Sequence, residues 1–523
     1  MTLESMFFPL APEWMLLIGA GVVLALGLVR TPARGSWCTA TAFLSIAAAL
    51  AWTTKNGVPD GSYAQLGLWL TPLTYYARCI ALSIGAIVIL VNWHQPTRDE
   101  CGEYMALILA SLLGILLTAS ANDLIVLFFA IELVSVPTYV LVALSRNDQR
   151  APEAAVKYFF LGALAAALLA YGFSFLYGAA GTTTIHTVMN RIGTSNLAPA
   201  VNHTGYVWLG MLLALGGLGF KIAAVPFHAY VADVYEGSAS PISGMLGFVP
   251  KFAGFVALMK LLGALHWDLP PAIVWALWAM AAATMTVGNV LALLQKNVKR
   301  ILAYSSIAHT GYMLIALLVG PVAEGSPLRD GAAALLFYIA IYGTMNLGAF
   351  ALLDAFERKG KPIETFDDLA GLSARSPATA FALAVCVFSL MGFPPTAGFL
   401  GKWFVFGSAF STPAGHPFQG ALIALAILGV VNSAIGAAYY LRIVASAYMG
   451  RESSGFTPGS GRPLRVGAFV CAAFLLLVFV KPATLTRQSK IASDSLRAAE
   501  LSKLVHGQTL NLVENGDQRG EVK

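Results

Sequence analysis

Residues 123–145, DLIVLFFAIELVSVPTYVLVALS, set the class of this protein. The stretch is apolar over the roughly 20 residues that a membrane-spanning helix needs. It carries one carboxylate, Glu132, near its middle. A soluble fold has no use for so long an apolar run with an acid at its centre, so we interpret the stretch as a membrane span that holds a functional group.

The same pattern continues along the 523 residues. They are 58% hydrophobic and 11% charged, with a mean hydropathy of +0.72, whereas soluble domains carry roughly 25% charged residues. The composition therefore predicts an all-α, polytopic membrane protein. We expect about fourteen spans of the required length, at 14–30, 37–53, 73–93, 104–121, 123–145, 152–178, 205–231, 240–266, 271–294, 300–320, 331–355, 378–409, 418–449 and 464–480.

Basic residues predict the orientation of these spans. They concentrate in loops that follow odd-numbered spans, such as Arg146 with Arg150 and Lys299 with Arg300. The positive-inside rule therefore places both termini outside the cytoplasm. Residues 481–523 form a polar C-terminal tail, in which Ser493 is expected to cap the start of a short helix. The basic loop residues indicate topology and do not form a nucleic-acid-binding stripe.

Five of the ionisable residues within the predicted spans stand out as candidates. An ionised group at mid-bilayer costs at least about 2.5–3.5 kcal/mol, so such groups usually face a bundle interior or a water-filled path and mark proton relays. Burial raises the pKa of a carboxylate and lowers that of a lysine, so a Glu/Lys set can exchange protons near neutral pH. The candidates for proton transfer are Glu132, Lys157, Lys221, Lys251 and Lys402.

The alternative to a relay is a side chain that reaches the membrane surface or forms a structural ion pair. This alternative has real weight for Lys157, which lies close to a span end, and it is favoured for Lys260 and Arg442. Glu132, Lys221 and Lys251 have long apolar flanks on both sides, which disfavour it.

Prolines predict two interrupted spans. Pro226 follows Lys221 within the seventh span, and Pro394-Pro395 precede Lys402 within the twelfth. Proline removes a backbone donor and breaks a helix. Two broken spans in comparable positions of two halves indicate a transport site between inverted repeats.

Two histidines are weaker candidates. His228 follows the first break, and His309 lies within the tenth span. The ordinary pKa of histidine suits proton transfer, although a structural core histidine is the alternative for both.

No motif for a bound cofactor or metal is present. The five cysteines are scattered and form no C-x-x-C spacing. The chain also lacks a P-loop, a G-x-G-x-x-G turn and an H-E-x-x-H helix. We therefore expect no cofactor in this chain and no redox catalysis by it alone.

Five segments together resemble subunit N, the antiporter-like membrane-arm subunit of respiratory complex I. They are VKYFFLGALAAALLAYGFSFLYGAAGTT (156–183), GLGFKIAAVPFHAYVADVYEG (217–237), VPKFAGFVALMKLL (249–262), QKNVKRILAYSSIAHTGYMLIAL (295–317) and SLMGFPPTAGFLGKWFVF (389–406). The resemblance implies 14 transmembrane helices with two inverted five-helix repeats and broken helices 7 and 12. The repeats would cover about 104–266 and 271–449, flanked by helices in 14–93 and 464–480 within one transmembrane domain, 1–480.

The resemblance also implies roles. Glu132 and Lys221 would form the charged pair of one half-channel, Lys251 would bridge, and Lys402 would release protons from the other half. Lys157 belongs to the same set, with His228 and His309 as further relay candidates. The protein would couple quinone reduction elsewhere in a proton-pumping NADH:quinone oxidoreductase to proton transfer. Quinone, NAD, FMN and iron–sulfur clusters would then lie in partner subunits, which include other antiporter-like and small membrane-arm subunits.

Two other functions remain open from the sequence. A subunit of a multi-subunit cation/proton antiporter shares the helix pattern, but those proteins usually carry an L-P-x-A-H stretch after the seventh-span break, where this chain has HAYVADVYEG. A structural scaffold without transport would have no reason to retain five costly charges. The expected location is a bacterial inner membrane, with a thylakoid membrane as the alternative.

Overall fold

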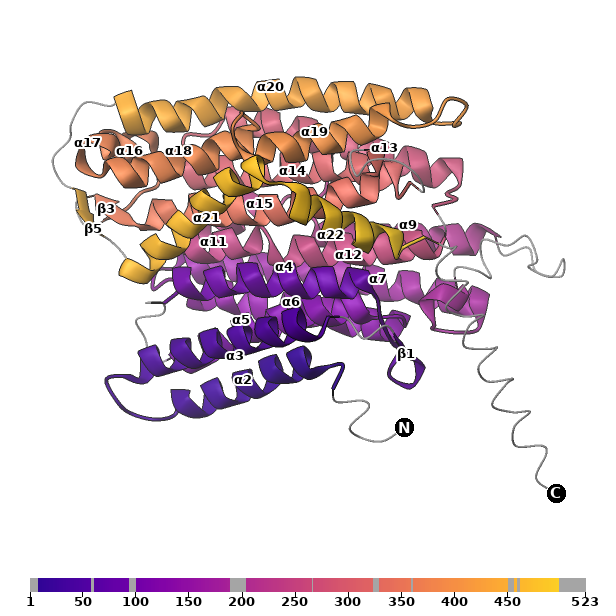
Figure 1. Ribbon diagram of the computed structural model, residues 1–523, viewed down its shortest axis with the longest axis horizontal. Coiled ribbons are helices and arrows are strands. Elements are labelled where there is room, and N and C mark those ends of the chain that lie inside the picture. Colours follow the sequence, from indigo (N-terminus) through magenta and orange to yellow (C-terminus); the bar gives the residue numbers. More distant parts are fainter. Residues whose placement is uncertain are drawn as a thin grey trace.

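The computed structural model describes residues 8–57, 61–93, 100–188, 204–265, 267–322, 329–358, 361–449, 456–458 and 461–497. Within these ranges the chain is a bundle of roughly parallel and antiparallel helices, shown along its length in Figure 1. In this described part of the chain, eleven helices are long and apolar enough to cross a membrane, and three shorter apolar helices accompany them. The predicted all-α, multi-pass membrane class is confirmed.

The helices of 16 residues or more follow the predicted spans closely. They are α2 (Ala11–Gly27), α3 (Arg34–Asn56), α4 (Pro72–Val91), α5 (Cys101–Ser120), α6 (Leu124–Leu144), α7 (Arg150–Ala180), α9 (Thr204–Lys221), α12 (Val249–Ala264), α13 (Pro271–Leu293), α14 (Val298–Val319), α15 (Gly331–Asp354), α20 (Gln419–Met449) and α21 (Arg462–Val480). Shorter helices complete the bundle: α10 (Val231–Gly237), α11 (Ser240–Leu246), α16 (Phe366–Leu369), α17 (Leu372–Arg375), α18 (Pro377–Met391), α19 (Ala397–Phe410) and α22 (Ala483–Asp494).

Strands occur only as short pieces at the two ends of the described bundle. β1 (Gly61–Tyr63) pairs antiparallel with β2 (Leu68–Leu70), with Ser62 opposite Trp69 and the turn η1 (Ala64–Leu66) between them. At the other end, β3 (Phe356–Arg358) lies between β4 (Lys361–Pro362) and β5 (Phe456–Pro458). These short strands connect loops between helices, and the fold is still all-α.

Polar side chains mark where several helices begin. The Asp123 carboxylate accepts hydrogen bonds from the backbone amides of Ile125 and Val126 at the start of α6. The Asn297 side chain does the same for two amides at the start of α14. Such caps satisfy backbone donors that lack a partner in the first helical turn.

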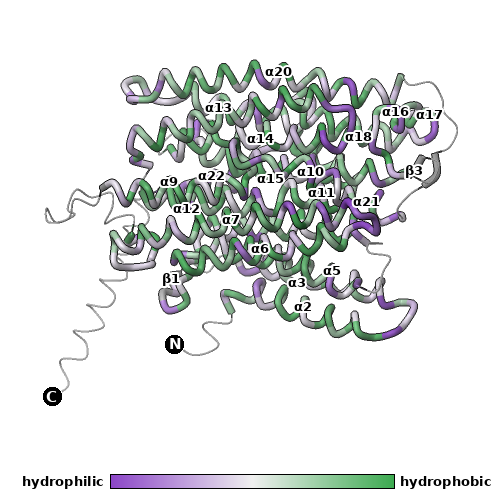
Figure 2. Tube along the Cα trace, turned by 180° about the vertical axis from the view of Figure 1, so that it is seen from behind, coloured by the Kyte–Doolittle hydropathy of each residue, from purple (hydrophilic) through white to green (hydrophobic). Residues whose placement is uncertain are grey.

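The core of the bundle is centred on α15. The side chains of this helix are buried from Gly331 to Leu353, and α14, α18, α19, α21 and α22 pack around it. Outer helices instead expose large apolar side chains, such as Phe160 on α7 and Val431 on α20. Hydrophobic residues predominate along the length of the bundle, as Figure 2 shows, which suits a surface covered by lipid or by other membrane subunits.

Two spans are interrupted, near the predicted positions. α9 ends at Lys221 and the chain resumes its helix only at Val231. α18 ends at Met391 and α19 begins at Ala397. Each connection contains a cis peptide bond to proline, Val225–Pro226 in the first and Pro394–Pro395 in the second.

The C-terminal region differs from the sequence prediction. Ser493 does not start a helix but lies in the last turn of α22, which packs on α15 and α4. The reason is that Ser493 and Lys490 bond to Asp330 at the start of α15. The remainder of the predicted tail, 498–523, lies outside the described residues.

Candidate functional site

Lys221 ends α9 inside the bundle, with Glu132 of α6 opposite it. The lysine Nζ lies 2.8 Å from Oε1 of Glu132. It also donates to Oγ of Ser135 at 2.8 Å and to the hydroxyl of Tyr139 at 3.5 Å. Since the side chain of Lys221 is 3% exposed and that of Glu132 19%, the pair is a largely buried ion pair with further polar support. Removing one partner of such a pair leaves an uncompensated buried charge.

The break after Lys221 frees a backbone carbonyl that a second helix uses. Ile222 lies just beyond the end of α9, and its carbonyl oxygen accepts a hydrogen bond from Thr310 of α14 at 2.7 Å. The backbone of α12 comes close at the same point, because a Cβ on Gly254 would lie 2.7 Å from Ile222 Cγ2. The break therefore brings α12 and α14 against the end of α9.

Lys251 of α12 shares Thr310 with this break. Its Nζ donates to Oγ1 of Thr310 at 2.9 Å, and to the carbonyl oxygen and Oγ of Ser306 at 2.5 and 2.6 Å. The ring of Tyr342 lies 5.6 Å away. Thr310 thus connects Lys251 to the residue that follows Lys221, through one side chain.

Lys402 of α19 sits at the second break. Its Nζ donates to the carbonyl oxygen of Met391, where α18 ends, and to Oγ of Ser433 on α20, both at 2.8 Å. The ring of Tyr312 lies 5.1 Å from the same nitrogen. A cation beside the C-terminal carbonyls of a helix is favoured by the helix dipole, so the broken end of α18 provides a place for the lysine.

Lys221, Lys251 and Lys402 differ in their counter-charges. Within the described residues, Lys221 has a carboxylate partner, whereas Lys251 and Lys402 have only neutral acceptors. Taking an ion out of water costs several kcal/mol unless its partners compensate. This row of lysines, Lys221, Lys251 and Lys402, therefore contains one amine with a counter-ion and two whose described partners are neutral.

His309 of α14 lies near both unpaired lysines, and it is buried with 1% exposure. Its Nδ1 is 2.6 Å from the hydroxyl of Tyr338 and its Nε2 is 3.0 Å from the hydroxyl of Tyr440. His309 can be selected from the sequence, whereas the two tyrosines cannot. An aromatic residue in an apolar span gives no signal by itself, and only the tertiary contact identifies these two.

Lys157 and His228 are not joined to this row by the described contacts. Lys157 lies on the surface of α7, 45% exposed, and pairs with Glu153 at 2.8 Å and Asp233 at 3.1 Å. His228 lies half-buried in the connection after α9, with a buried Nδ1 that has no hydrogen-bond partner among the described residues.

Lys157 instead belongs to a charged cluster at one end of the bundle. Asp233 of α10 bonds both Lys157 and Arg300, and Arg300 reaches Glu236 at 2.7 Å. Burial acts to raise the pKa of Asp233, but the hydrogen bonds and charges of Lys157 and Arg300 outweigh burial and hold the pKa below its ordinary value. The cluster ties α7, α10 and α14 together beside the first break.

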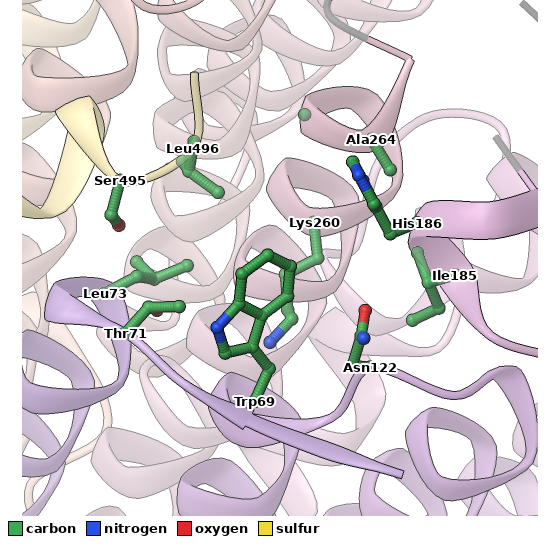
Figure 3. Close-up of a pocket in the computed structure, with 11 residues that line it drawn as sticks. Trp69, Thr71, Leu73, Asn122, Ile185, His186, Lys260, Ala264, Ser495 and Leu496 are labelled. Atoms are coloured by element: carbon green, nitrogen blue, oxygen red, sulfur yellow. The ribbon is translucent and has the colours of Figure 1, made fainter. Parts of the chain in front are cut away.

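Lys260 occupies a small pocket at the opposite end of the bundle. The pocket measures about 50 Å³ and is lined by Trp69, Asn122, His186 and Leu496, as Figure 3 shows. The amine donates at 2.6 Å to the carbonyl oxygen of Ala119, next to the end of α5. This contact fits the favoured structural interpretation, since a cation stabilises the C-terminal end of a helix.

The described residues contain no group of three histidines, cysteines or carboxylates that could hold a metal ion. The side chains gathered here are those of lysine, glutamate, histidine and tyrosine, which can donate or accept hydrogen bonds.

The comparisons with known proteins place this arrangement in a class. A family model described as "NADH:quinone oxidoreductase/Mrp antiporter, TM" matches residues 121–435. The fold and the match define an antiporter-like membrane subunit. NADH-quinone oxidoreductase subunit N from Paramagnetospirillum magneticum is 35% identical over 93% of this chain and 97% of its own length. The chain belongs to the NADH-quinone oxidoreductase subunit N family, whose members are one of the membrane subunits of respiratory complex I.

Solved structures agree. A chain of respiratory complex I from Thermus thermophilus superimposes with a TM-score of 0.73 at 30% identity, covering 91% of this chain and 98% of that one. A chain of the Mrp complex from Dietzia has a TM-score of 0.76, with 95% and 98% coverage, but only 20% identity, so it shows the shared fold alone. The resemblance to subunit N is confirmed.

Proposed function

We propose that this chain carries protons across the membrane along the buried row Glu132–Lys221, Lys251, His309 and Lys402, as part of a proton-pumping NADH:quinone oxidoreductase. The observation that carries the proposal is the placement of lysines at two helix breaks, Lys221 at the end of α9 and Lys402 against the end of α18. Broken helices at membrane depth supply backbone groups for ion or proton sites.

The first step is the opening of the Glu132–Lys221 pair. While the pair is closed, the carboxylate stabilises the ammonium of Lys221 at 2.8 Å. When the pair opens, the ammonium is left buried without its counter-ion, which favours release of its proton. Thr310, bonded to the Ile222 carbonyl and to Lys251, lies on the short route to the next lysine.

The second step takes the proton from Lys251 toward Lys402. Both amines rest on neutral acceptors, so neither holds a proton as firmly as Lys221 does beside Glu132. Lys402 is the releasing group of the second half, and it regains a proton from the row in the next cycle. Lys157, on the surface of α7, serves this path through the charged cluster with Asp233 and Arg300 rather than inside the row.

The architecture that supports this transfer is a set of 14 transmembrane helices with inverted repeats over about 104–266 and 271–449. The end of the bundle that holds α16, α17 and β3 (Figure 1) faces the cytoplasm, because the basic loops lie there. The protein works in a bacterial inner membrane beside other antiporter-like and small membrane-arm subunits. The redox cofactors and the quinone are held by other subunits of the complex, whose reaction drives the opening of the pair.

The test uses the whole complex in inverted membrane vesicles. Lys221→Ala and Glu132→Gln are compared with Lys55→Ala, an exposed lysine at the end of α3. NADH-driven quinone reduction and proton uptake are measured together, and assembly is checked on a native gel. We expect both rates to fall in the first two variants and to persist in the third. Wild-type rates in intact Lys221→Ala and Glu132→Gln complexes would refute the proposal.

A further inference from the structure

His309 is hydrogen-bonded at both ring nitrogens to tyrosines from two other helices. Nδ1 meets the hydroxyl of Tyr338 on α15 at 2.6 Å, and Nε2 meets the hydroxyl of Tyr440 on α20 at 3.0 Å. The Tyr440 hydroxyl also bonds to Oγ of Ser305 on α14. Tyr338, Tyr440 and Ser305 are each at most 1% exposed, so bulk water does not compete for these contacts.

One end of this four-group chain lies next to Lys251. Ser305 is the neighbour of Ser306, whose carbonyl oxygen and hydroxyl both accept hydrogen bonds from Nζ of Lys251. The ring of Tyr342 lies 5.6 Å from that nitrogen, and its centroid lies 5.1 Å from the centroid of His309. The ring of Tyr342 thus lies near both the lysine and the histidine.

The other end lies next to Lys402. The ring of Tyr338 packs against the backbone of Gly401, where a Cβ would lie 2.2 Å from Cδ2 of the tyrosine. Gly401 immediately precedes Lys402 on α19. The ring of Tyr312 lies 5.1 Å from Nζ of Lys402, and its centroid lies 5.6 Å from that of His309.

The chemistry of the groups makes the chain continuous. A neutral imidazole has one nitrogen that donates and one that accepts, and a hydroxyl can do both at once. The four groups can therefore all point one way, from Tyr338 to Ser305, or all point the other way. Each hydrogen bond then has one donor and one acceptor, with no hydrogen left between two donors.

We propose that Tyr338 and Tyr440 are proton-relay residues that, with His309 and Ser305, connect Lys251 to Lys402. The inference rests on the proposed proton transport and adds two residues to its path. A proton that reaches the hydroxyl at one end bonds to its oxygen as that hydroxyl passes its own hydrogen to the next group. His309 binds a proton at one nitrogen and releases the proton from the other. One proton enters, one leaves at the far end, and no group keeps a changed charge.

A purely structural role for the tyrosines is the competing explanation. It predicts that loss of a hydroxyl weakens packing at these positions as it would at any buried tyrosine. Tyr104 on α5 is a matched control, because it is fully buried and its hydroxyl donates to Asn92 at 2.8 Å, away from the lysine row.

The experiment compares Tyr440→Phe, Tyr338→Phe and Tyr104→Phe in the whole complex, with Glu132→Gln as the reference for blocked transport. Quinone reduction and proton uptake by inverted vesicles are measured in H2O and in D2O. We expect the first two variants to assemble and to lose roughly a hundredfold in both rates, at the low end for removal of a proton-transfer group. Their solvent isotope effects should rise, because the hop becomes rate-limiting, and a structural defect would not cause that rise.

Addition of His309→Asn to Tyr440→Phe should cause little further loss, because both changes interrupt one chain. If one tyrosine variant fails to assemble, the other still tests the relay, because the two tyrosines bond to different nitrogens of His309. The relay is wrong if both tyrosine variants match Tyr104→Phe in rate and isotope effect while Glu132→Gln is blocked. If Glu132→Gln itself transports normally, the proposed function fails, whatever the tyrosines do.

Discussion

The Nζ of Lys402 lies 2.8 Å from the carbonyl oxygen of Met391, the last residue of α18. The lysine belongs to α19, on the other side of the break, so one broken span provides both the cation and the carbonyl that holds it. At the other break the arrangement is related but different. Lys221 ends α9, and the freed carbonyl of Ile222 is taken by Thr310. At both breaks, a backbone carbonyl that would be hydrogen-bonded within a continuous helix instead accepts a hydrogen bond from a polar side chain of the bundle.

Gly392 is the residue that lets the second break close on Lys402. It has φ +82°, and a Cβ there would lie 2.7 Å from Cδ of Lys402. Gly392→Ala should therefore cost about 1–3 kcal/mol in backbone strain alone and should push the lysine from Met391. We expect lower proton uptake with a lower thermal stability of the complex. Gly420→Ala, at a site on α20 with open space around it, should leave both quantities near wild type. Equal behaviour of the two variants would show that the position of Lys402 does not depend on this glycine.

Thr310 is predicted to matter because two groups depend on its one hydroxyl. Thr310→Val removes the donor to Ile222 and an acceptor for Lys251, and it leaves a buried carbonyl unsatisfied at about 1–3 kcal/mol. Coupled quinone reduction and proton uptake should fall together. Thr344→Val is the control, since Thr344 is buried and bonds only to the carbonyl of Ala340 in its own helix. Retention of full transport by Thr310→Val would remove this residue from the route between Lys221 and Lys251.

Much of the fold could be predicted from the sequence, for a simple physical reason. Apolar runs long enough to span a bilayer have few alternatives, and charges within them stand out because burial is costly. Glu132, Lys221, Lys251 and Lys402 could be selected on this basis. Lys157 shows the limit of the argument, because a lysine near a span end can turn outward, and this one pairs with Glu153 and Asp233 at the surface.

The tyrosines of the site could not be selected in this way. α15 is buried over its whole length, so it has no polar face to indicate which side of the helix approaches His309. Tyr338 looks no different in sequence from Tyr342, which bears no hydrogen bond to the histidine. The packing of the polar helix α22 could not be predicted either, because its partner Asp330 lies far away in the sequence.

Gly401 should control the approach of Tyr338 to α19. A Cβ at Gly401 would lie 2.2 Å from the tyrosine ring, and a buried ring cannot move without disturbing its neighbours. Gly401→Ala should thus cost about 1–3 kcal/mol by overpacking and should lengthen the contact between Tyr338 and His309. We expect lower proton uptake and a raised solvent isotope effect, as for Tyr338→Phe. The double variant Gly401→Ala/Tyr338→Phe should transport protons only slightly more slowly than Gly401→Ala. A fully additive loss would show that the glycine does not act through Tyr338.

The docking of α22 is predicted to depend on pH in the alkaline range. Lys490 donates to Asp330 and Asp494, at 2.8 and 2.5 Å. Burial acts to lower the pKa of Lys490, but the hydrogen bonds to Asp330 and Asp494 outweigh burial and raise the pKa above the ordinary 10.5. A group whose pKa is raised on folding stabilises the folded state below its ordinary pKa, and this contribution is lost as the pH rises through the higher folded value.

Cleavage of α22 by an alkali-tolerant protease should therefore stay slow up to about pH 10 and accelerate above the ordinary lysine pKa. Lys490→Met lacks the titrating group, so its cleavage should already be fast at pH 8 and should change little with further alkali. Asp330→Asn should also be cleaved fast at pH 8, because it loses the carboxylate to which Lys490 and Ser493 donate hydrogen bonds. Slow cleavage of Lys490→Met at pH 8 would mean that apolar contacts with α15 and α4 hold the helix without this ion pair.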